Sequence, residues 1–168
     1  MSDPVARRPM TTSFAPDRIL FRLPLRIYWE DTDAGGIVFY ANYLKFFERA
    51  RTEWLRSLGH EQEKLRAETG TVFVVTDTRV RYLKPARLDD LLSVTVALEH
   101  AGRAMMTIAQ QAWRPSPSLS GENELLAEGT IRIGCVNAGT FKPQRIPNAI
   151  AASLPAFMAD EPYEIKPG

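Results

Sequence analysis

The sequence has little of what several protein classes require. Cys135 is the only cysteine among 168 residues, so no disulfide can form within the chain. The only histidines, His60 and His100, lack the Cys/His spacing of a metal site. A formal charge of +1, from 21 basic and 20 acidic residues, offers no electrostatic basis for general nucleic-acid binding. We therefore expect no nucleic-acid partner, no metal, and a Cys135 side chain that packs in the core.

Long apolar runs and glycine-rich phosphate loops are also absent. No stretch approaches the roughly 18 apolar residues that span a bilayer, so we expect no membrane span. Residues 1–18 contain no apolar segment of the kind found in a secretory signal, which favours a cytoplasmic protein. No Walker or Rossmann pattern occurs, and catalysis should need no cofactor.

Apolar residues at spacings of three and four predict one long helix, from about Asn42 to Leu58. Asn42 is expected to cap its start, and Gly59 follows its end. The residues of the apolar stripe are Tyr43, Phe46, Phe47, Ala50, Trp54, Leu55 and Leu58. We expect this face to pack against a sheet.

Alternating apolar residues predict a strand from Leu20 to Trp29, at a sheet edge or a bulge because it contains Pro24. A polar connection, 60–70, follows the helix. Four further strands are predicted at about Val72–Leu83, Leu91–Glu99, Ala104–Trp113 and Leu125–Asn137. This order indicates an α+β fold with an antiparallel sheet. We expect a flexible arm, 1–18, a single domain, 19–147, and a C-terminal helix and tail, 148–168.

The most informative stretch runs from Trp29 to Tyr43, where an acidic cluster and paired glycines lead into the long helix. The first N–H groups of a helix have no intrahelical partner and carry the positive end of its dipole. A carboxylate beside such donors suits acyl transfer, which needs a nucleophile or base together with an oxyanion site. The alternative is that Asp31 and Asp33 only cap a turn while the glycines relieve strain.

The pattern resembles the hotdog-fold acyl-CoA thioesterases of the 4-hydroxybenzoyl-CoA thioesterase type, and most closely the branch associated with the Tol-Pal system. The motifs that carry the resemblance are Tyr-Trp-Glu-Asp-Thr-Asp-Ala-Gly-Gly (28–36), Ala-Asn-Tyr-Leu (41–44), Glu-Arg-Ala-Arg-Thr-Glu (48–53) and Lys-Pro-Ala-Arg-Leu-Asp-Asp (84–90). The resemblance implies a five-stranded antiparallel sheet wrapped around one long helix. It also implies hydrolysis of acyl-CoA to free acid and coenzyme A, by a homodimer or homotetramer.

The resemblance assigns the catalytic role to Asp33, as nucleophile or as general base for water. It assigns the backbone N–H of Tyr40 to the thioester carbonyl. The Tol-Pal branch usually has histidine at position 40. The backbone role does not depend on the side chain, whereas a tyrosine hydroxyl, with a reference pKa of about 10, is a poor base near neutral pH.

Substrate binding is predicted for Gly36 and for four basic residues. Arg79 and Arg81 lie on one face of a predicted strand, with Lys84 and Arg87 beyond it, where they could meet the phosphates of coenzyme A. The alternative for these four is an ordinary solvent-facing surface.

Several alternatives stay open. Glu48, paired with Arg51 or Thr52 on the helix, is a second candidate carboxylate. Asp31 either raises the pKa of Asp33 or holds the loop by hydrogen bonds. A dehydratase would need a His-Phe-Pro loop, which is absent. A non-catalytic acyl-binding or envelope-associated scaffold, or a hydrolase acting on acyl-carrier protein, is compatible with the sequence, as is any acyl-chain length.

Overall fold

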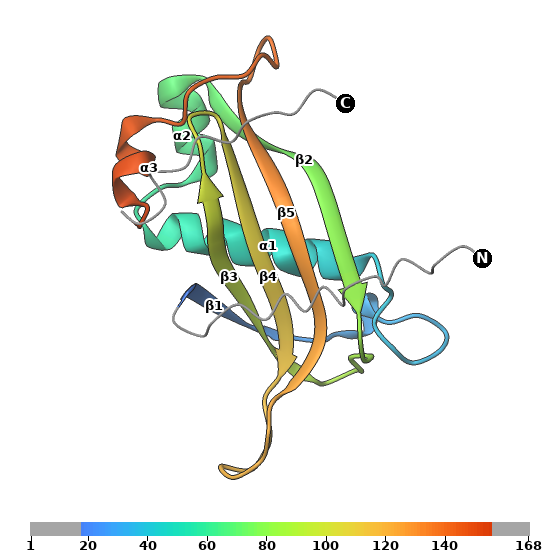
Figure 1. Ribbon diagram of the computed structural model, residues 1–168. Helices are drawn as coiled ribbons and strands as arrows, with labels where there is room; N and C mark the ends of the chain where they lie inside the picture. Colours follow the sequence, from blue (N-terminus) through green and yellow to red (C-terminus); the bar gives the residue numbers. More distant parts are fainter. Residues whose placement is uncertain (1–17, 156–168) are drawn as a thin grey trace, which may run out of the picture.

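A computed structural model describes residues 18–155. Five strands form one sheet in the order β1-β3-β4-β5-β2, and each neighbouring pair is antiparallel. Their bounds are β1 Ile19–Arg26, β2 Thr71–Tyr82, β3 Leu91–Ala101, β4 Met105–Arg114 and β5 Glu124–Asn137. Helix α1, Asn42–Ser57, crosses one face of the sheet (Figure 1). The predicted α+β fold, a five-stranded antiparallel sheet around one long helix, is confirmed.

The arm and tail predicted from sequence fall almost entirely on residues 1–17 and 156–168, which lie outside the described residues. A short C-terminal helix, α3, runs over Asn148–Ser153. The division into arm, domain and tail therefore stays a prediction. In the range 18–155, no helix combines the length and the apolar character that crossing a membrane requires.

Strand β1 lies at one edge of the sheet and pairs with β3 alone. Pro24, which has no N–H to donate, is tolerated there because the outer side of an edge strand needs no hydrogen-bond partner. The strand ends at Arg26, earlier than predicted, and the chain then forms a 3₁₀ turn over Trp29–Asp31. The expectation that Trp29 continues the inward face was wrong, because its side chain is 79% exposed. The apolar alternation of the strand does not extend past Ile27, which is fully buried.

Helix α1 buries the predicted apolar stripe except Leu58, which lies just past its end. The prediction that Asn42 caps the helix was wrong. Ala41 occupies that position, and Asn42 is the first helical residue, with a buried side chain that bonds elsewhere. Gly59 follows the end as expected, with a φ of 91°.

The segment predicted as a polar connection, 60–70, contains a helix that the sequence analysis missed, α2, Gln62–Thr69. Its polar sequence supplies a single buried apolar residue, Leu65, so no helical apolar period is visible. The helix packs against β2 and α1.

The core lies between α1 and the inner face of the sheet, which α1 contacts through β1, β3 and β4. Gly129 of β5 lies beneath Phe47, and a Cβ there would come within 2.8 Å of the Arg79 carbonyl oxygen and 3.3 Å of the Phe47 ring. The absence of a side chain therefore lets the sheet approach the helix closely. Cys135 is buried, as predicted.

Candidate active site

A tight hairpin over residues 31–38, here called the Asp33 hairpin, lies between the end of β1 and the start of α1. Its turn is closed by the Asp33 N–H to the Ile37 carbonyl, at 2.9 Å, and by the Gly36 N–H to the Asp33 carbonyl, at 3.0 Å. Thr32 and Val38 pair across it. Gly36 has a φ of 75°, which other L-residues rarely adopt, so glycine is what permits this reversal.

The Asp33 carboxylate is exposed and is oriented by its own turn. Its Oδ1 accepts a hydrogen bond from the Gly35 N–H at 2.8 Å. Among the described residues, no donor bonds to its other oxygen. One carboxylate oxygen thus fixes the rotamer, and the second remains available to a ligand or to water.

Asp31 holds the hairpin in place. The residue is buried, and its Oδ2 accepts from the Tyr28 N–H at 2.8 Å. Its carbonyl oxygen accepts from the Phe39 N–H and from the Asn42 side chain, each at 2.9 Å. These bonds support the interpretation that Asp31 holds the loop by hydrogen bonds.

The start of α1 presents two unpaired backbone donors. The Asn42 N–H already bonds to the Phe39 carbonyl at 2.9 Å, and the next two N–H groups bond to Tyr40 and Ala41. Within residues 18–155, no acceptor is found for the N–H of Tyr40 or of Ala41. These groups carry the positive end of the helix dipole and can stabilise a developing oxyanion.

A cavity of about 210 Å³ lies beside the Tyr40 donor. Its lining consists of Ile37, Val38, Tyr40, Tyr43, Tyr82, Leu83, Lys84 and Pro85. The Tyr40 and Tyr82 rings are 6.0 Å apart, and the Tyr43 and Tyr82 rings 5.5 Å, both edge to face. Burial raises the pKa of Tyr43 and of Tyr82, so both hydroxyls stay protonated near neutral pH. Apart from Lys84, the walls are therefore apolar with neutral hydroxyls.

The hairpin rests on the segment that follows β2, residues 83–90, here called the support loop. The Val38 N–H donates to the Ala86 carbonyl at 2.9 Å, and Ile37 pairs with Arg87. Ala86 is fully buried, and its own N–H donates to the Tyr43 hydroxyl at 3.2 Å. The hairpin, the support loop and α1 are thus joined through one residue.

The predicted basic residues separate into two groups. Lys84 lines the cavity and bonds to Glu124 at 2.7 Å, and Arg87 lies against Ile37 of the hairpin. Arg81 forms an ion pair with the buried Glu128. Arg79 and Arg81 alternate with Tyr82, whose ring contacts Tyr43 of α1, so they lie on the opposite face of the sheet.

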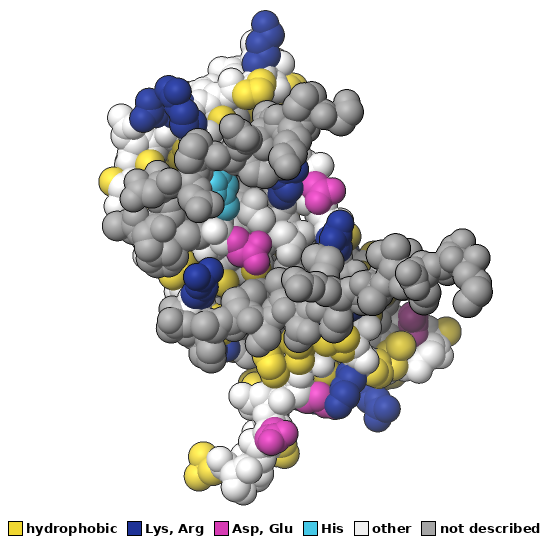
Figure 2. Space-filling view, in the orientation of Figure 1, with side chains coloured by type: hydrophobic (Ala, Val, Ile, Leu, Met, Phe, Trp, Pro, Cys, Tyr) yellow, Lys and Arg dark blue, Asp and Glu magenta, His cyan; other side chains and the backbone are white. Residues whose placement is uncertain are grey.

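In a space-filling view, hydrophobic side chains lie together with Lys or Arg side chains at the end of the molecule where β2 ends (Figure 2). This is the end that carries the cavity and the support loop. Such a mixture suits a ligand with an apolar part and an anionic part.

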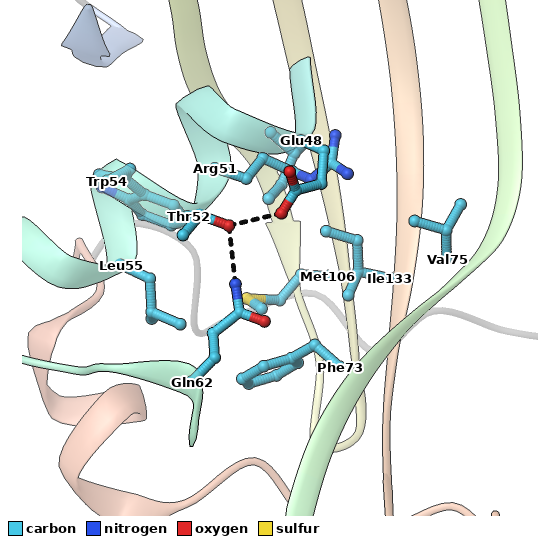
Figure 3. Close-up of a pocket in the computed structure, with 11 residues that line it drawn as sticks. Glu48, Arg51, Thr52, Trp54, Leu55, Gln62, Phe73, Val75, Met106 and Ile133 are labelled. Atoms are coloured by element: carbon cyan, nitrogen blue, oxygen red, sulfur yellow. Dashed lines mark hydrogen bonds between the residues drawn. The ribbon is translucent and has the colours of Figure 1, made fainter. Parts of the chain in front are cut away.

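Glu48 faces a different cavity, of about 130 Å³, between the second half of α1 and strands β2, β4 and β5 (Figure 3). Its carboxylate accepts from the Thr52 hydroxyl at 2.7 Å, and that hydroxyl accepts from Gln62 at 2.8 Å. The predicted Glu48–Thr52 contact is present. No lining residue is common to the two cavities, so Glu48 lies at a different cavity from the Tyr40 donor, and Asp33 lines neither of them.

Sequence reasoning missed three residues of this site. Tyr43 was assigned to the core alone, yet it also lines the cavity, and its hydroxyl accepts from the Ala86 N–H. Tyr82 was not singled out, although its alternation with Arg79 and Arg81 places it on the inner face. Ala86 acts through its backbone, for which the sequence carries no signal.

Comparison with known proteins places these features in a family. The model of the thioesterase superfamily matches residues 35–120, which include half of the Asp33 hairpin and all of α1. "Acyl-CoA thioesterase YbgC" of Haemophilus influenzae is 39% identical over 134 residues, covering 80% of this chain and 93% of that protein. "Acyl-CoA thioester hydrolase YbgC" of Escherichia coli O157:H7 is 41% identical over 135 residues, covering 80% and 96%.

A solved structure agrees. The probable thioesterase from Bartonella henselae superimposes with a TM-score of 0.68 at 29% identity, covering 75% of this chain and 98% of that one. The predicted resemblance to hotdog-fold thioesterases is thereby confirmed, and the chain belongs to the thioesterase superfamily.

Proposed function

We propose that this protein hydrolyses acyl-CoA thioesters to a free acid and coenzyme A. The observation that carries the proposal is the unpaired Tyr40 N–H at the start of α1, beside an apolar cavity and next to the hairpin that presents Asp33. The names of the relatives from H. influenzae and E. coli describe the same activity in those proteins.

In the proposed mechanism, the thioester carbonyl oxygen accepts a hydrogen bond from the Tyr40 N–H. Charge that develops on this oxygen in the transition state is stabilised by the donor and by the helix dipole. The free oxygen of Asp33 either attacks the carbonyl carbon or removes a proton from an attacking water. In the first route, loss of the thiolate leaves an anhydride between the acyl group and Asp33, which water hydrolyses to the free acid and the Asp33 carboxylate. In the second route, the tetrahedral intermediate formed by water loses the thiolate directly and gives the free acid. The thiolate takes up a proton in both routes.

The rest of the substrate follows the cavity and its rim. Gly36 has no atom within 4 Å of where a Cβ would stand, so the chain of a thioester can approach the backbone closely there. Arg87, beside the hairpin, and Lys84, at the cavity, are the proposed contacts for phosphate. Phosphate contacts by Arg79 and Arg81, on the other sheet face, stay predictions.

The working form is proposed to be a homodimer or homotetramer. Large apolar side chains around the site are exposed, including Trp29 at 79% and Tyr40 at 62%. In the described part of the chain, one side of β2 has no strand partner. A second copy could cover these groups. A cytoplasmic location and an association with the Tol-Pal system stay predictions.

The test is thiol release from short, long and aromatic acyl-CoAs, followed with a thiol-reactive dye. Wild type, Asp33→Asn and Glu48→Gln are compared after circular dichroism confirms that each is folded. We expect turnover by wild type, a loss of at least about a hundredfold in kcat for Asp33→Asn, and retained turnover for Glu48→Gln. Equal activity of wild type and Asp33→Asn would remove Asp33 from the chemistry. No release by either would favour acyl-carrier protein as substrate or an acyl-binding role.

A further inference from the structure

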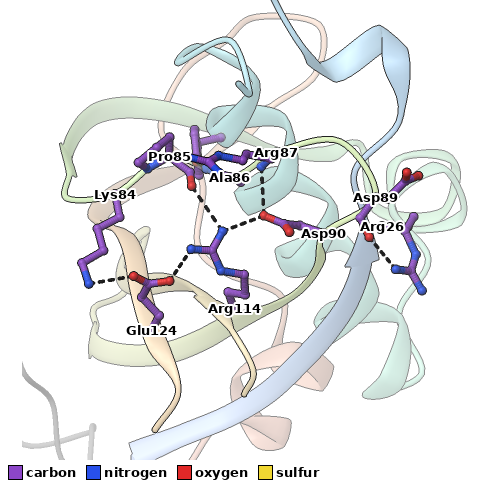
Figure 4. Close-up of polar contacts among 10 residues, drawn as sticks. Arg26, Lys84, Pro85, Ala86, Arg87, Asp89, Asp90, Arg114 and Glu124 are labelled. Atoms are coloured by element: carbon purple, nitrogen blue, oxygen red, sulfur yellow. Dashed lines mark hydrogen bonds and ion pairs between the residues drawn. The ribbon is translucent and has the colours of Figure 1, made fainter. Parts of the chain in front are cut away.

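The support loop is fastened by a network of charged side chains, of which only Lys84 lines the cavity (Figure 4). Arg114, at the end of β4, donates through Nη1 to Asp90 Oδ2 at 2.8 Å and weakly to the Pro85 carbonyl at 3.4 Å. Its Nη2 donates to Glu124, whose other oxygen bonds to Lys84 at 2.7 Å. One guanidinium therefore reaches both ends of the loop.

These contacts should hold the loop more firmly than fully exposed ion pairs would. The side chains of Arg114, Asp90 and Glu124 are all half-buried, so water screens them less than exposed pairs. Asp90 Oδ2 also accepts from the Arg87 N–H at 2.9 Å. The carboxylate that holds Arg114 thus fixes the backbone of the residue that pairs with Ile37.

The loop does not hold this shape by its own backbone preferences. Asp89 has a φ of 69°, in the left-handed region that residues other than glycine rarely occupy. Backbone bonds between residues 89–90 and Ile27, just after β1, fasten the end of the loop, and Arg26 of β1 donates to the Asp89 carbonyl at 2.6 Å. The middle of the loop, residues 85–87, is fastened through Arg114, Asp90 and Tyr43.

The middle of the loop is also the part on which the hairpin rests. Ile37, four residues after Asp33, pairs with Arg87. The N–H of Val38, five residues after Asp33, bonds to the Ala86 carbonyl. Displacement of residues 85–87 would therefore move the second arm of the hairpin. The base of the first arm would stay in place, because Asp31 holds it through Tyr28, Phe39 and Asn42. The displacement would instead reach Asp33, whose N–H bonds to the Ile37 carbonyl at 2.9 Å.

We propose that Arg114 is a positioning residue for catalysis, which holds the support loop so that the Asp33 hairpin keeps its carboxylate aligned with the Tyr40 donor. The inference rests on the proposed function, since it assumes that Asp33 is catalytic. Arg114 does not line the cavity and reaches the hairpin through Asp90 and Ala86. Its links to residues that line the cavity are the weak bond to the Pro85 carbonyl and the bond to Glu124, which holds Lys84. Its removal should slow the chemical step more than it weakens binding.

The experiment compares wild type, Arg114→Met and Arg114→Lys, with Arg56→Met as the matched control. Arg56 pairs with Glu53 on the exposed side of α1, away from the cavity. For Arg114→Met we expect kcat to fall by about tenfold or more and KM to change by less than about threefold. Arg114→Lys keeps the charge but not the fork, so it should recover part of the loss. Arg56→Met should match wild type.

Hydrogen exchange provides a readout that does not depend on turnover. In Arg114→Met the Val38 amide, bonded to Ala86, should exchange faster, while the Phe39 amide, bonded to Asp31, should keep its wild-type rate. Unchanged kcat, unchanged Val38 exchange, or a change in KM alone would overturn the proposal. Equal acceleration at Val38 and Phe39 would also overturn it, because that result means general loosening.

Two milder variants keep the test decisive if Arg114→Met does not fold. Asp90→Asn and Glu124→Gln keep the shape of the side chain and one acceptor oxygen, and remove one charge each. Each should lower kcat by at least about threefold and accelerate exchange at Val38. Wild-type behaviour of both would contradict the proposal. Asp33→Asn separates the two hypotheses. Turnover that survives this change refutes the proposed catalytic role of Asp33, whereas Asp33-dependent turnover with full activity in the Arg114 variants refutes positioning alone.

Discussion

The side-chain amide of Asn42 donates a hydrogen bond to the backbone carbonyl of Asp31, eleven residues earlier, at 2.9 Å. Asn42 is the first residue of α1, and Asp31 begins the Asp33 hairpin. The bond therefore ties the helix that begins just after the Tyr40 donor to the hairpin that carries the carboxylate. Both residues are buried, so water cannot easily replace either partner if this hydrogen bond is removed.

Asn42→Ala tests this tie. The change removes one buried hydrogen bond, while the Asp31 carbonyl keeps its bond from the Phe39 N–H, so we expect a loss of about 0.5–1.5 kcal/mol in the free energy of unfolding. It should also lower kcat, because hairpin and donor are no longer held together. Urea unfolding and steady-state kinetics measure the two effects. Loss of stability with full kcat would show that the bond serves folding alone.

Asp31 and Asp33 should respond in opposite ways to alanine. Asp31→Ala leaves the Tyr28 N–H without its buried acceptor and should cost about 1–2 kcal/mol of stability. Asp33 is exposed, so Asp33→Ala should change stability by no more than about 0.5 kcal/mol while removing turnover. Thermal unfolding of the two variants decides between these expectations. Equal destabilisation would contradict the separation of roles.

Alanine at Gly35 and at Gly36 should affect different properties. A Cβ at Gly35 would meet Asp33 Oδ1 at 3.0 Å, so Gly35→Ala should displace the carboxylate and lower kcat by about tenfold. At Gly36 no atom lies within 4 Å, and the cost comes from the φ of 75°, about 1–2 kcal/mol of stability. Kinetics and urea unfolding of both variants provide the comparison. Identical profiles would mean that the hairpin responds as one unit.

Tyr43 should make stability depend on alkaline pH. Burial raises its pKa, so the folded protein keeps the phenolic proton to higher pH than the unfolded chain, whose reference value is about 10. The contribution is complete below about pH 10 and is lost as pH rises through the folded pKa. The unfolding free energy of wild type should therefore fall more steeply above about pH 10 than that of Tyr43→Phe. Urea titrations of both proteins from neutral to alkaline pH test this; parallel curves would contradict it.

Cys135 should not react with a thiol dye in the folded protein. The thiol is buried, burial raises its pKa, and Sγ lies 3.6 Å from the Arg145 carbonyl oxygen. Reactive cysteines need an exposed thiolate, and this residue provides neither condition. We expect one equivalent of thiol to appear only after urea unfolding. Rapid labelling of native protein would contradict the burial and would also raise the background of the thioesterase assay.

The sequence predicted those features that depend on local pattern. The period of α1 and the alternation of the strands are visible because each residue type reports its own burial, and they gave element bounds within a few residues. The Gly36 turn was likewise readable, because a positive φ restricts the residue type. Helix α2 was missed because only Leu65 marks its buried side.

Tertiary structure decided the features that depend on contacts between distant segments. Asp31 and Asp33 are chemically identical in sequence, and only the approach of Phe39 and Asn42 makes one buried and structural while the other stays exposed. The pairing of Arg114 with Asp90 joins residues 24 positions apart, and no local period reports it. The sequence by itself therefore determined the elements and the candidate carboxylate, while packing between the hairpin, the support loop and α1 decided how that carboxylate is held.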